Sequence, residues 1–148
     1  MFFVGASEFF TTWYMKILGR LTNIVPVDPD SHLLHAMKVG AWGLQQGRVL
    51  CIFPEGLRSF DGGLKEFKKG AAILSLEVGA PIVPVGLNGT FEVWPRDTLR
   101  IRPHKVRLTF GAAMEPPELD GSSYQEMTDR LRNEVARLTG QFRAVDVG

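Results

Sequence analysis

The residues best suited to chemistry lie in the segment Phe53–Ser59, Phe-Pro-Glu-Gly-Leu-Arg-Ser, where an acid and a base share a glycine-containing turn. The planar guanidinium of Arg58 matches phosphate oxygens in a bidentate manner, and Gly56 lets backbone and ligand approach closely. Because a carboxylate repels phosphate, Glu55 is suited instead to orienting Arg58 or to accepting a hydrogen bond from a substrate hydroxyl. The segment predicts a site for a phosphate-bearing substrate. The alternative is an Arg–Glu pair that only fixes a loop.

A strand is expected to position this segment. Val49–Phe53 is apolar throughout, as is typical of a strand buried on both faces, and Pro54 ends it by removing a backbone donor. Ligands of open α/β sheets usually bind at the carboxyl ends of strands, where Glu55 and Arg58 fall. Cys51, the single cysteine, lies within this strand and is predicted to pack in the core, with a reactive thiol as the alternative. A single cysteine excludes a disulfide framework and a cysteine metal site.

Strands and helices alternate along the rest of the chain. Residues 23–27 predict a short strand, and the capping residues that follow predict a helix that ends at Gly47. Residues 70–78 predict a helix, and residues 81–85 a second buried strand, in which Pro84 favours an edge position or a local irregularity. Two helices have predicted core stripes: Leu34, Met37, Ala41 and Leu44 in the first, and Tyr124, Met127, Leu131, Val135 and Leu138 in a helix that ends at Gly140.

Composition indicates one domain and limits the class of partner. A length of 148 residues with 45% hydrophobic content is enough for a sizeable core. A net charge of +1 gives no general support for nucleic-acid binding. One local basic cluster stands out, with Val106, Leu108 and Phe110 alternating beside it, so a half-exposed strand would hold its cations outward. The cluster is a solvated strand face or a site for anionic lipid headgroups or a phosphorylated cofactor. Its members are Arg96, Arg100, Arg102, Lys105 and Arg107, next to Asp97 and His104.

The first residues carry neither the basic lead-in of a secretory signal nor a membrane-spanning stretch. The segment Phe9–Leu21 is nevertheless rich in aromatic and aliphatic side chains. It is interpreted as a buried helix, with contact to a membrane interface as the alternative.

Three segments in order resemble the third and fourth sequence blocks of the glycerophospholipid acyltransferases: Phe53–Ser59, Phe67–Ala71 and Pro81–Val85. The resemblance covers roughly residues 1–115 and implies an α/β domain, a mostly parallel sheet flanked by helices, as in glycerol-phosphate acyltransferases. By position in the motifs, it assigns substrate binding to Glu55, Gly56, Arg58 and Ser59. Lys68 and Lys69 are added to the substrate-binding residues for their positive charge, and the scaffold of the site is expected to be Phe53, Pro54, Pro81 and Pro84.

The resemblance also implies a reaction in phospholipid biosynthesis. An acyl group passes from an acyl thioester, acyl-CoA or acyl-carrier protein, to the hydroxyl of a lysophosphatidate or similar lysophospholipid. No metal and no bound cofactor are expected. The expected location is the cytoplasm, peripheral at the inner face of a membrane.

Two departures from the family pattern change these expectations. The family uses a His-x4-Asp block as its catalytic pair, and none of His32, His35 and His104 is followed at the fifth position by a carboxylate. No catalytic residue is therefore assigned. Asp28-Pro29 also stands where the family usually has a basic residue.

Two interpretations follow from the absent pair. In the first, residues 1–148 are a partial, N-terminally truncated acyltransferase domain that is inactive alone and lacks an N-terminal segment or partner domain. This predicts exposed apolar surface near the strands of Val49 and Ile82. In the second, the chain is a non-catalytic module that binds anionic lipid or stabilises a partner.

Overall fold

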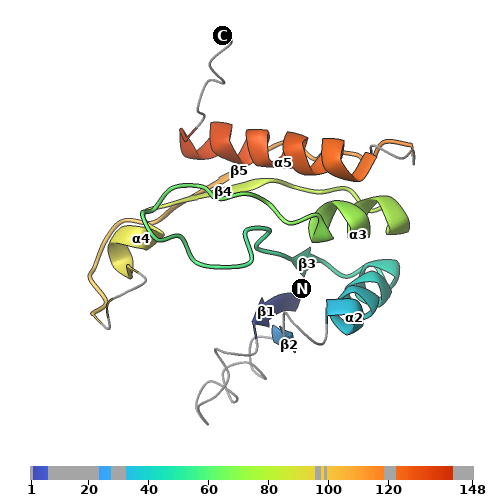
Figure 1. The fold of residues 1–148 in the computed structure, drawn as a ribbon, viewed down its shortest axis with the longest axis horizontal. Helices are drawn as coiled ribbons and strands as arrows, with labels where there is room; N and C mark the ends of the chain where they lie inside the picture. Colours follow the sequence, from blue (N-terminus) through green and yellow to red (C-terminus); the bar gives the residue numbers. More distant parts are fainter. Residues whose placement is uncertain are drawn as a thin grey trace.

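The computed structural model describes residues 2–6, 24–27, 33–95, 98, 100–118 and 123–141 (Figure 1). The predicted helix over residues 9–21 and the cluster members Arg96 and Asp97 lie outside the described residues. The described elements are β1 (Phe2–Ala6), β2 (Ile24–Val27), α2 (Leu33–Gln45), β3 (Leu50–Cys51), α3 (Gly70–Val78), β4 (Val85–Asn88), α4 (Thr90–Val93), β5 (Arg107–Phe110) and α5 (Ser123–Thr139).

The strands form two small sheets. The first is parallel, in the order β2-β1-β3, with Phe3 opposite Ile24 on one side and Phe2 opposite Leu50 on the other. The second is an antiparallel pair of β4 and β5, in which Val85 lies opposite Phe110. The predicted α/β class with parallel strands is confirmed, and the antiparallel pair adds a second sheet to it.

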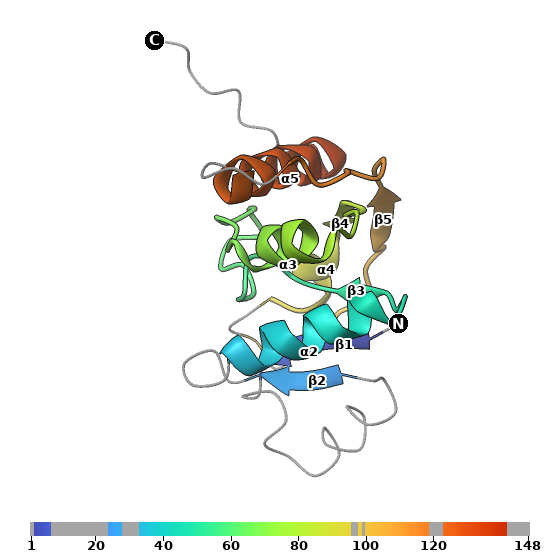
Figure 2. The ribbon, with the colours of Figure 1, turned by 90° about the vertical axis from the view of Figure 1, so that its right-hand side faces the viewer.

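Among the described helices, α2 and α5 each pack against α3 and also contact the sheets, and the short α4 follows β4. Helix α2 contacts β2, β3 and α3, and α5 contacts α3, β4 and β5, so α3 lies between the other two. Figures 1 and 2 show α5 along β4 and β5, with α3 beneath it. The main core lies where α3 meets α5. It consists of Ala72, Leu76 and Met127, with Ile82, Met114 and Tyr124 packed against it.

The closing helix follows its predicted stripe. Met127 is fully buried and Leu131 nearly so, while Tyr124, Val135 and Leu138 are half-buried. The helix stops before Gly140, whose φ of +71° suits glycine. The Tyr124 hydroxyl donates a hydrogen bond to Glu77 of α3, and this bond raises the pKa of Tyr124.

The buried face of α2 is shifted from the predicted stripe, of which Met37, Ala41 and Leu44 are half-buried. Leu34 of the predicted stripe is 79% exposed. Ala36, Gly40 and Gly43 are buried instead, and a Cβ on Gly40 would lie 3.2 Å from side-chain atoms of both Leu50 and Leu74. Small residues at this spacing let α2 approach β3 and α3 closely. The predicted stripe, which was based on hydrophobicity alone, did not include the small residues that make this close contact.

Both predicted buried strands are shorter than expected. Only Leu50 and Cys51 of the first are paired, and Val49 and Phe53 are 62% and 64% exposed. β3 pairs only with β1 within the described part of the chain, so its flanking residues remain uncovered. In the second, regular pairing begins at Val85, after the fully buried Pro84.

Pro84 marks the irregularity predicted for it. Before it, Ile82 exchanges two backbone hydrogen bonds with Met114, of 2.8 and 3.0 Å. The carbonyl of Pro84 accepts a hydrogen bond of 2.9 Å from the Gly111 amide. Because proline has no N–H to donate, the ladder becomes regular only after it.

The β4–β5 pair places its apolar side chains on the exposed face. A Cβ on Gly86 would lie 2.7 Å from Cβ of Leu138, so the face that includes Gly86 packs against α5. Thr109 lies opposite Gly86 and is half-buried, whereas Leu108 and Phe110, which the predicted half-exposed strand would cover, are exposed. The other face exposes Val85, Leu87, Leu108 and Phe110. Together with the exposed Val49 and Val83, these residues confirm the predicted apolar surface near the two strands.

No helix in the described ranges has the length and apolar character needed to cross a membrane.

Candidate functional site

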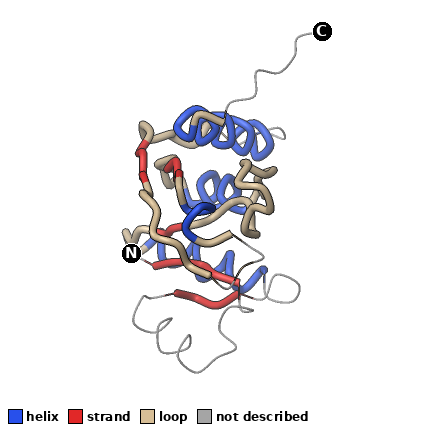
Figure 3. The backbone as a smooth tube through the Cα atoms, turned by 90° about the vertical axis from the view of Figure 1, so that its left-hand side faces the viewer, coloured by secondary structure: helices blue, strands red, loops and turns tan. Residues whose placement is uncertain are grey.

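The Phe-Pro-Glu-Gly-Leu-Arg-Ser segment opens a long loop, residues 54–68, which is closed at its base by two hydrogen bonds. The amide of Lys68 donates to the carbonyl of Pro54 at 2.8 Å. The amide of Lys65 donates to Oε2 of Glu55, also at 2.8 Å. The structure therefore gives the Glu55 carboxylate a position inside the loop, where it orders the backbone. Figure 3 shows this loop, and the one between α4 and β5, as tan segments.

Gly56 and Lys68 are brought together at this base. The Gly56 amide donates to the carbonyl of Phe53 at 3.1 Å, and its φ of +72° is a conformation that favours glycine. A Cβ at this position would lie 2.9 Å from Cε and 3.1 Å from Nζ of Lys68. The absence of a side chain at Gly56 thus lets the Lys68 ammonium lie directly over the motif backbone.

Arg58 is exposed, and its guanidinium lies over an aromatic ring. Its Cζ is 4.7 Å from the centroid of Trp94, which follows α4. A guanidinium stacked by its face keeps in-plane N–H donors at its edge, the geometry that suits phosphate oxygens. Trp94 was missed in the sequence because nothing in its own neighbourhood connects it with the motif.

Ser59 is engaged within the loop. Its hydroxyl oxygen is 2.8 Å from the carbonyl oxygen of Gly63 and 3.0 Å from Oδ1 of Asp61, and it donates its one hydrogen to either of them. The amide of Gly63 also donates to Asp61 at 2.9 Å. These bonds make a compact turn, so a substrate contact by Ser59 would compete with a bond that the loop already uses.

Helix α5 and Gln141, which lies just after it, hold the far side of the loop. The Gln141 side chain accepts a hydrogen bond from the Leu64 amide at 2.6 Å and donates one to the Gly62 carbonyl at 3.1 Å. Arg132 donates from Nε to the Lys65 carbonyl at 3.2 Å and pairs with Glu66 at 3.5 Å. The sequence contains no local sign of these contacts, because the partners are separated by 66 or more positions.

The remaining predicted residues are placed at the edges of the loop. Phe53 is exposed and Pro54 half-buried at its start, while Lys69 is exposed at the first turn of α3. Pro81 is exposed, whereas Pro84 is fully buried beside Gly111. The structure therefore joins Glu55, Gly56 and Lys68 at one base, and it shows no contact of Pro81 or Pro84 with them within the described residues.

Cys51 lies just before the loop and is half-buried, so the predicted core position holds only in part. Burial raises the pKa of its thiol. A raised pKa keeps the thiol protonated near neutral pH and lowers its reactivity.

The basic segment, residues 100–107, is exposed along its whole length. Its backbone is anchored where the Arg102 amide donates to the Val93 carbonyl at 2.8 Å. A second anchor is Gly89, with a φ of +90°, because a Cβ there would lie 2.1 Å from the Lys105 carbonyl oxygen. The segment therefore presents its cations to solvent from a fixed backbone. Its basic members are Arg100, Arg102, Lys105 and Arg107.

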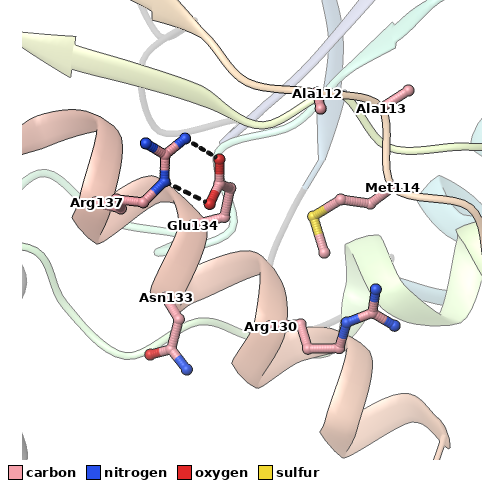
Figure 4. A pocket seen from close by; sticks show the side chains of 7 residues that line it. All are labelled: Ala112, Ala113, Met114, Arg130, Asn133, Glu134 and Arg137. Carbon is pink, nitrogen blue, oxygen red and sulfur yellow. Dashed lines mark hydrogen bonds and ion pairs between the residues drawn. The ribbon is translucent and has the colours of Figure 1, made fainter.

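A shallow depression of about 450 Å³ lies elsewhere, between α5 and the segment 112–114 (Figure 4). None of the predicted site residues lines it. Glu134 and Arg137, which do, pair with each other through bonds of 2.6 and 2.9 Å. The hydrogen bond to Arg137 lowers the pKa of Glu134. Because the acid and the base satisfy each other, this depression is a weaker candidate than the motif loop.

The chain, including the motif loop, is similar to a known protein family and to characterised proteins. Residues 1–88 match the family model described as Acyltransferase. The chain is 34% identical over 135 residues to the 1-acyl-sn-glycerol-3-phosphate acyltransferase of Limnanthes alba, covering 87% of this chain and 47% of that protein. It is 36% identical over 125 residues to the chloroplastic enzyme LPAT1 of Arabidopsis thaliana, covering 84% of this chain and 33% of that protein. The chain spans about half or less of the length of these curated relatives.

A solved structure shares the fold. The 1-acyl-sn-glycerophosphate acyltransferase PlsC of Thermotoga maritima superposes with a TM-score of 0.72 at 22% identity. The match covers 97% of this chain and 58% of that one. It supports the arrangement of helices and strands described above.

Proposed function

The chain belongs to the acyltransferase family, and on this premise we propose that it carries the acceptor-phosphate site of a lysophosphatidate acyltransferase. Glu55, Gly56, Arg58 and Lys68 form the centre of this site, with Ser59 and Lys69 beside it. Relatives named 1-acyl-sn-glycerol-3-phosphate acyltransferases support the substrate class. The acceptor in their name, 1-acyl-sn-glycerol-3-phosphate, has a phosphate and a free hydroxyl, which fits the chemistry of the loop.

The proposed reaction is acyl transfer from a thioester. The acceptor hydroxyl oxygen bonds to the thioester carbonyl carbon, the carbon–sulfur bond breaks, the hydroxyl proton passes to a base, and the thiolate leaves and is protonated. Acyl-CoA and acyl-carrier protein both supply such a thioester. The sequence contains no His-x4-Asp pair to act as the base, so we expect residues 1–148 alone to bind the acceptor without turnover.

One observation carries the proposal: the motif delivers two cations to one ordered loop. Gly56 lets Lys68 lie over the motif backbone, and Arg58 is held by its face over Trp94. Glu55 binds the Lys65 amide, which explains why an acid sits in a site for an anion. Two cations on an ordered backbone suit a phosphate, because charge-assisted hydrogen bonds strengthen when their donors need no reorganisation.

Binding of a soluble acceptor tests this site. Titration of residues 1–148 with a short-chain lysophosphatidate, below its micelle concentration, should show saturable binding at low salt. The matched monoacylglycerol, which has no phosphate, should bind far more weakly. Arg58→Ala should weaken lysophosphatidate binding roughly ten- to hundredfold, because it removes charge-assisted bonds.

Arg48→Ala is the matched control, since Arg48 also stacks on an indole, that of Trp42, and lies outside the motif loop. It should leave lysophosphatidate affinity unchanged. Equal affinity of the Arg58→Ala variant and the unchanged chain would remove Arg58 from the site. Release of thiol from acyl-CoA by residues 1–148 would show that a base other than His-x4-Asp serves the reaction.

A second function, binding to anionic membranes, is supported by the exposed basic segment 100–107. We propose that this segment holds the protein peripherally at the inner face of a membrane, where lysophospholipid acceptors reside. Each basic residue near an anionic surface contributes about 1 kcal/mol. Sedimentation with vesicles of phosphatidylglycerol should bring the chain down, and vesicles of phosphatidylcholine should not. Equal sedimentation with both would contradict this role.

A further inference from the structure

We propose that Trp94 is a positioning residue for the acceptor phosphate: its indole face holds the Arg58 guanidinium and thereby sets the preference for a phosphate-bearing over a neutral acceptor. This inference rests on the proposed function, because it assumes that Arg58 binds the phosphate. Trp94 lies outside every motif that the sequence singled out. It contributes through Arg58 and needs no contact with the substrate.

The indole is fixed in place from several sides. The Trp94 amide donates to the Thr90 carbonyl at 3.0 Å, which closes α4, and the indole Nε1–H donates to the Thr98 carbonyl at 2.7 Å. Just before it, the Val93 carbonyl accepts the Arg102 amide at 2.8 Å. With the backbone and the indole edge both bonded, the ring is a rigid platform. A guanidinium lying on it loses less rotational freedom on binding a phosphate than one in open solvent.

The platform and the motif loop are also held against each other. A Cβ on Gly62, whose φ is +81°, would lie 3.2 Å from the Phe91 ring in α4. In Figure 1 the loop after β3 extends to α4 before it returns to α3. This contact and the Arg58–Trp94 stack are independent observations of the same packing. The distance between ring and guanidinium is therefore set by the fold as well as by the two side chains.

The stack on Trp94 and the recognition of a phosphate use different directions of the Arg58 guanidinium. Its Cζ is 4.7 Å from the ring centroid, within the range in which cations are attracted to an indole face. The attraction acts perpendicular to the guanidinium plane, whereas phosphate recognition uses the N–H groups within that plane. The two interactions are compatible, and the first can orient the second.

Three variants separate positioning from general stability. Trp94→Leu removes the ring face, and Trp94→Phe keeps an aromatic face but loses the Nε1–H. Trp42→Leu is the control, since Cζ of Arg48 lies 5.1 Å from the centroid of that ring. Each variant is titrated with the short-chain lysophosphatidate and with the matched monoacylglycerol. Urea unfolding of each confirms that it is folded at the titration temperature.

We expect Trp94→Leu to weaken lysophosphatidate binding roughly three- to thirtyfold, the range of a cation–π contact. Monoacylglycerol binding should change less than twofold, so the phosphate preference falls. Trp94→Phe should restore most of the loss, and Trp42→Leu should have no effect. Addition of Trp94→Leu to Arg58→Ala should cause little further loss, since the ring acts through that arginine.

Other outcomes overturn the inference. If Arg58→Ala loses affinity and Trp94→Leu does not, Trp94 has no positioning role while the proposed acceptor site stands. Equal loss for both ligands, or a Trp94→Phe variant as weak as Trp94→Leu, would assign Trp94 a structural or hydrogen-bonding role instead. If Arg58→Ala binds as the unchanged chain does, or if the unchanged chain does not bind, the acceptor site fails and the inference fails with it.

Discussion

The motif loop, residues 54–68, and the basic segment, residues 100–107, carry cations of the same kind but hold them differently. The loop is closed by the Lys68–Pro54 hydrogen bond and tied to Gln141, just after α5, and its Arg58 lies on an indole. The basic segment is fixed through its backbone, at Arg102, beside Gly89 and where Arg107 pairs with Asn88, and its residues are exposed to solvent.

This difference distinguishes an ordered binding site from a diffuse patch of positive charge. A phosphate that must be placed for reaction gains from donors ordered before it arrives, and the hydrogen-bonded backbone of the loop suits the acceptor site that we propose. An anionic membrane surface offers many headgroups in any orientation, so exposed cations can bind it through charge alone. Net charge cannot make this distinction, since the chain as a whole carries only +1. The contacts that hold each cationic side chain do distinguish the two regions.

The largest effect is expected where the backbone anchors the basic segment. Gly89→Ala places a Cβ 2.1 Å from the Lys105 carbonyl oxygen at a φ of +90°. It should lower the free energy of unfolding by about 3 to 4 kcal/mol. Gly47→Ala is the matched control, with a φ of +69° and nothing within 4 Å of the added carbon, and should cost about 1 kcal/mol. Urea midpoints measure both. Equal costs would show that the segment shifts freely beside Gly89.

A double dissociation should separate the two cationic regions. Replacement of Arg100, Arg102 and Lys105 by glutamine should weaken binding to anionic vesicles about a hundredfold, from about 1 kcal/mol per charge, and leave binding of soluble lysophosphatidate within threefold. Arg58→Ala should show the opposite pattern. Vesicle sedimentation and ligand titration measure the two properties. If the triple variant lost soluble-ligand affinity as strongly as Arg58→Ala, the two regions would form one site.

Glu55 tests whether the loop needs its internal acceptor. Glu55→Ala removes the carboxylate that accepts the Lys65 amide, so it should destabilise the loop by about 1.5 kcal/mol and weaken lysophosphatidate binding. Glu55→Gln keeps an acceptor oxygen and should retain most of both properties. Amide exchange of Lys65 and ligand titration measure them. A Glu55→Gln variant that bound as weakly as Glu55→Ala would indicate that the charge itself acts on the substrate.

The smallest effect is expected at the contact between α5 and the loop. Gln141→Ala removes two exposed hydrogen bonds, to Leu64 and Gly62, and should loosen the loop by about 0.5 to 1 kcal/mol without changing global stability. Exchange of the Leu64 amide should accelerate up to about fivefold. Gln125→Ala, which removes a bond to Asp129 within α5, should leave that amide unchanged. Unchanged exchange in both variants would show that the loop orders itself.

Much of the fold was predictable because it rests on local chemistry. Capping residues and spacing located α3 with its terminal Gly79, whose φ is +69°, and the buried stripe of α5 around Met127. The parallel strand at 24–27 also followed from its apolar run. The buried face of α2 could not be predicted in this way, because glycines and an alanine pack closely there while Leu34 stays exposed. The hydrophobicity of a side chain reflects its free energy of transfer from water, and it does not indicate how closely two elements pack.

The kind of ligand chemistry was predicted from residues alone: an arginine, a glycine and two lysines around a proline-glutamate turn, in an order that resembles the acyltransferase blocks. How these residues are supported depends on contacts between distant parts of the chain. The tertiary structure joins Lys65 to Glu55, Gln141 to Leu64 across 77 positions, and Arg58 to Trp94. Residue types and turn preferences act over a few neighbours along the chain, whereas these contacts depend on where α4 and α5 pack. Packing is a property of the whole chain, so no single motif contains it.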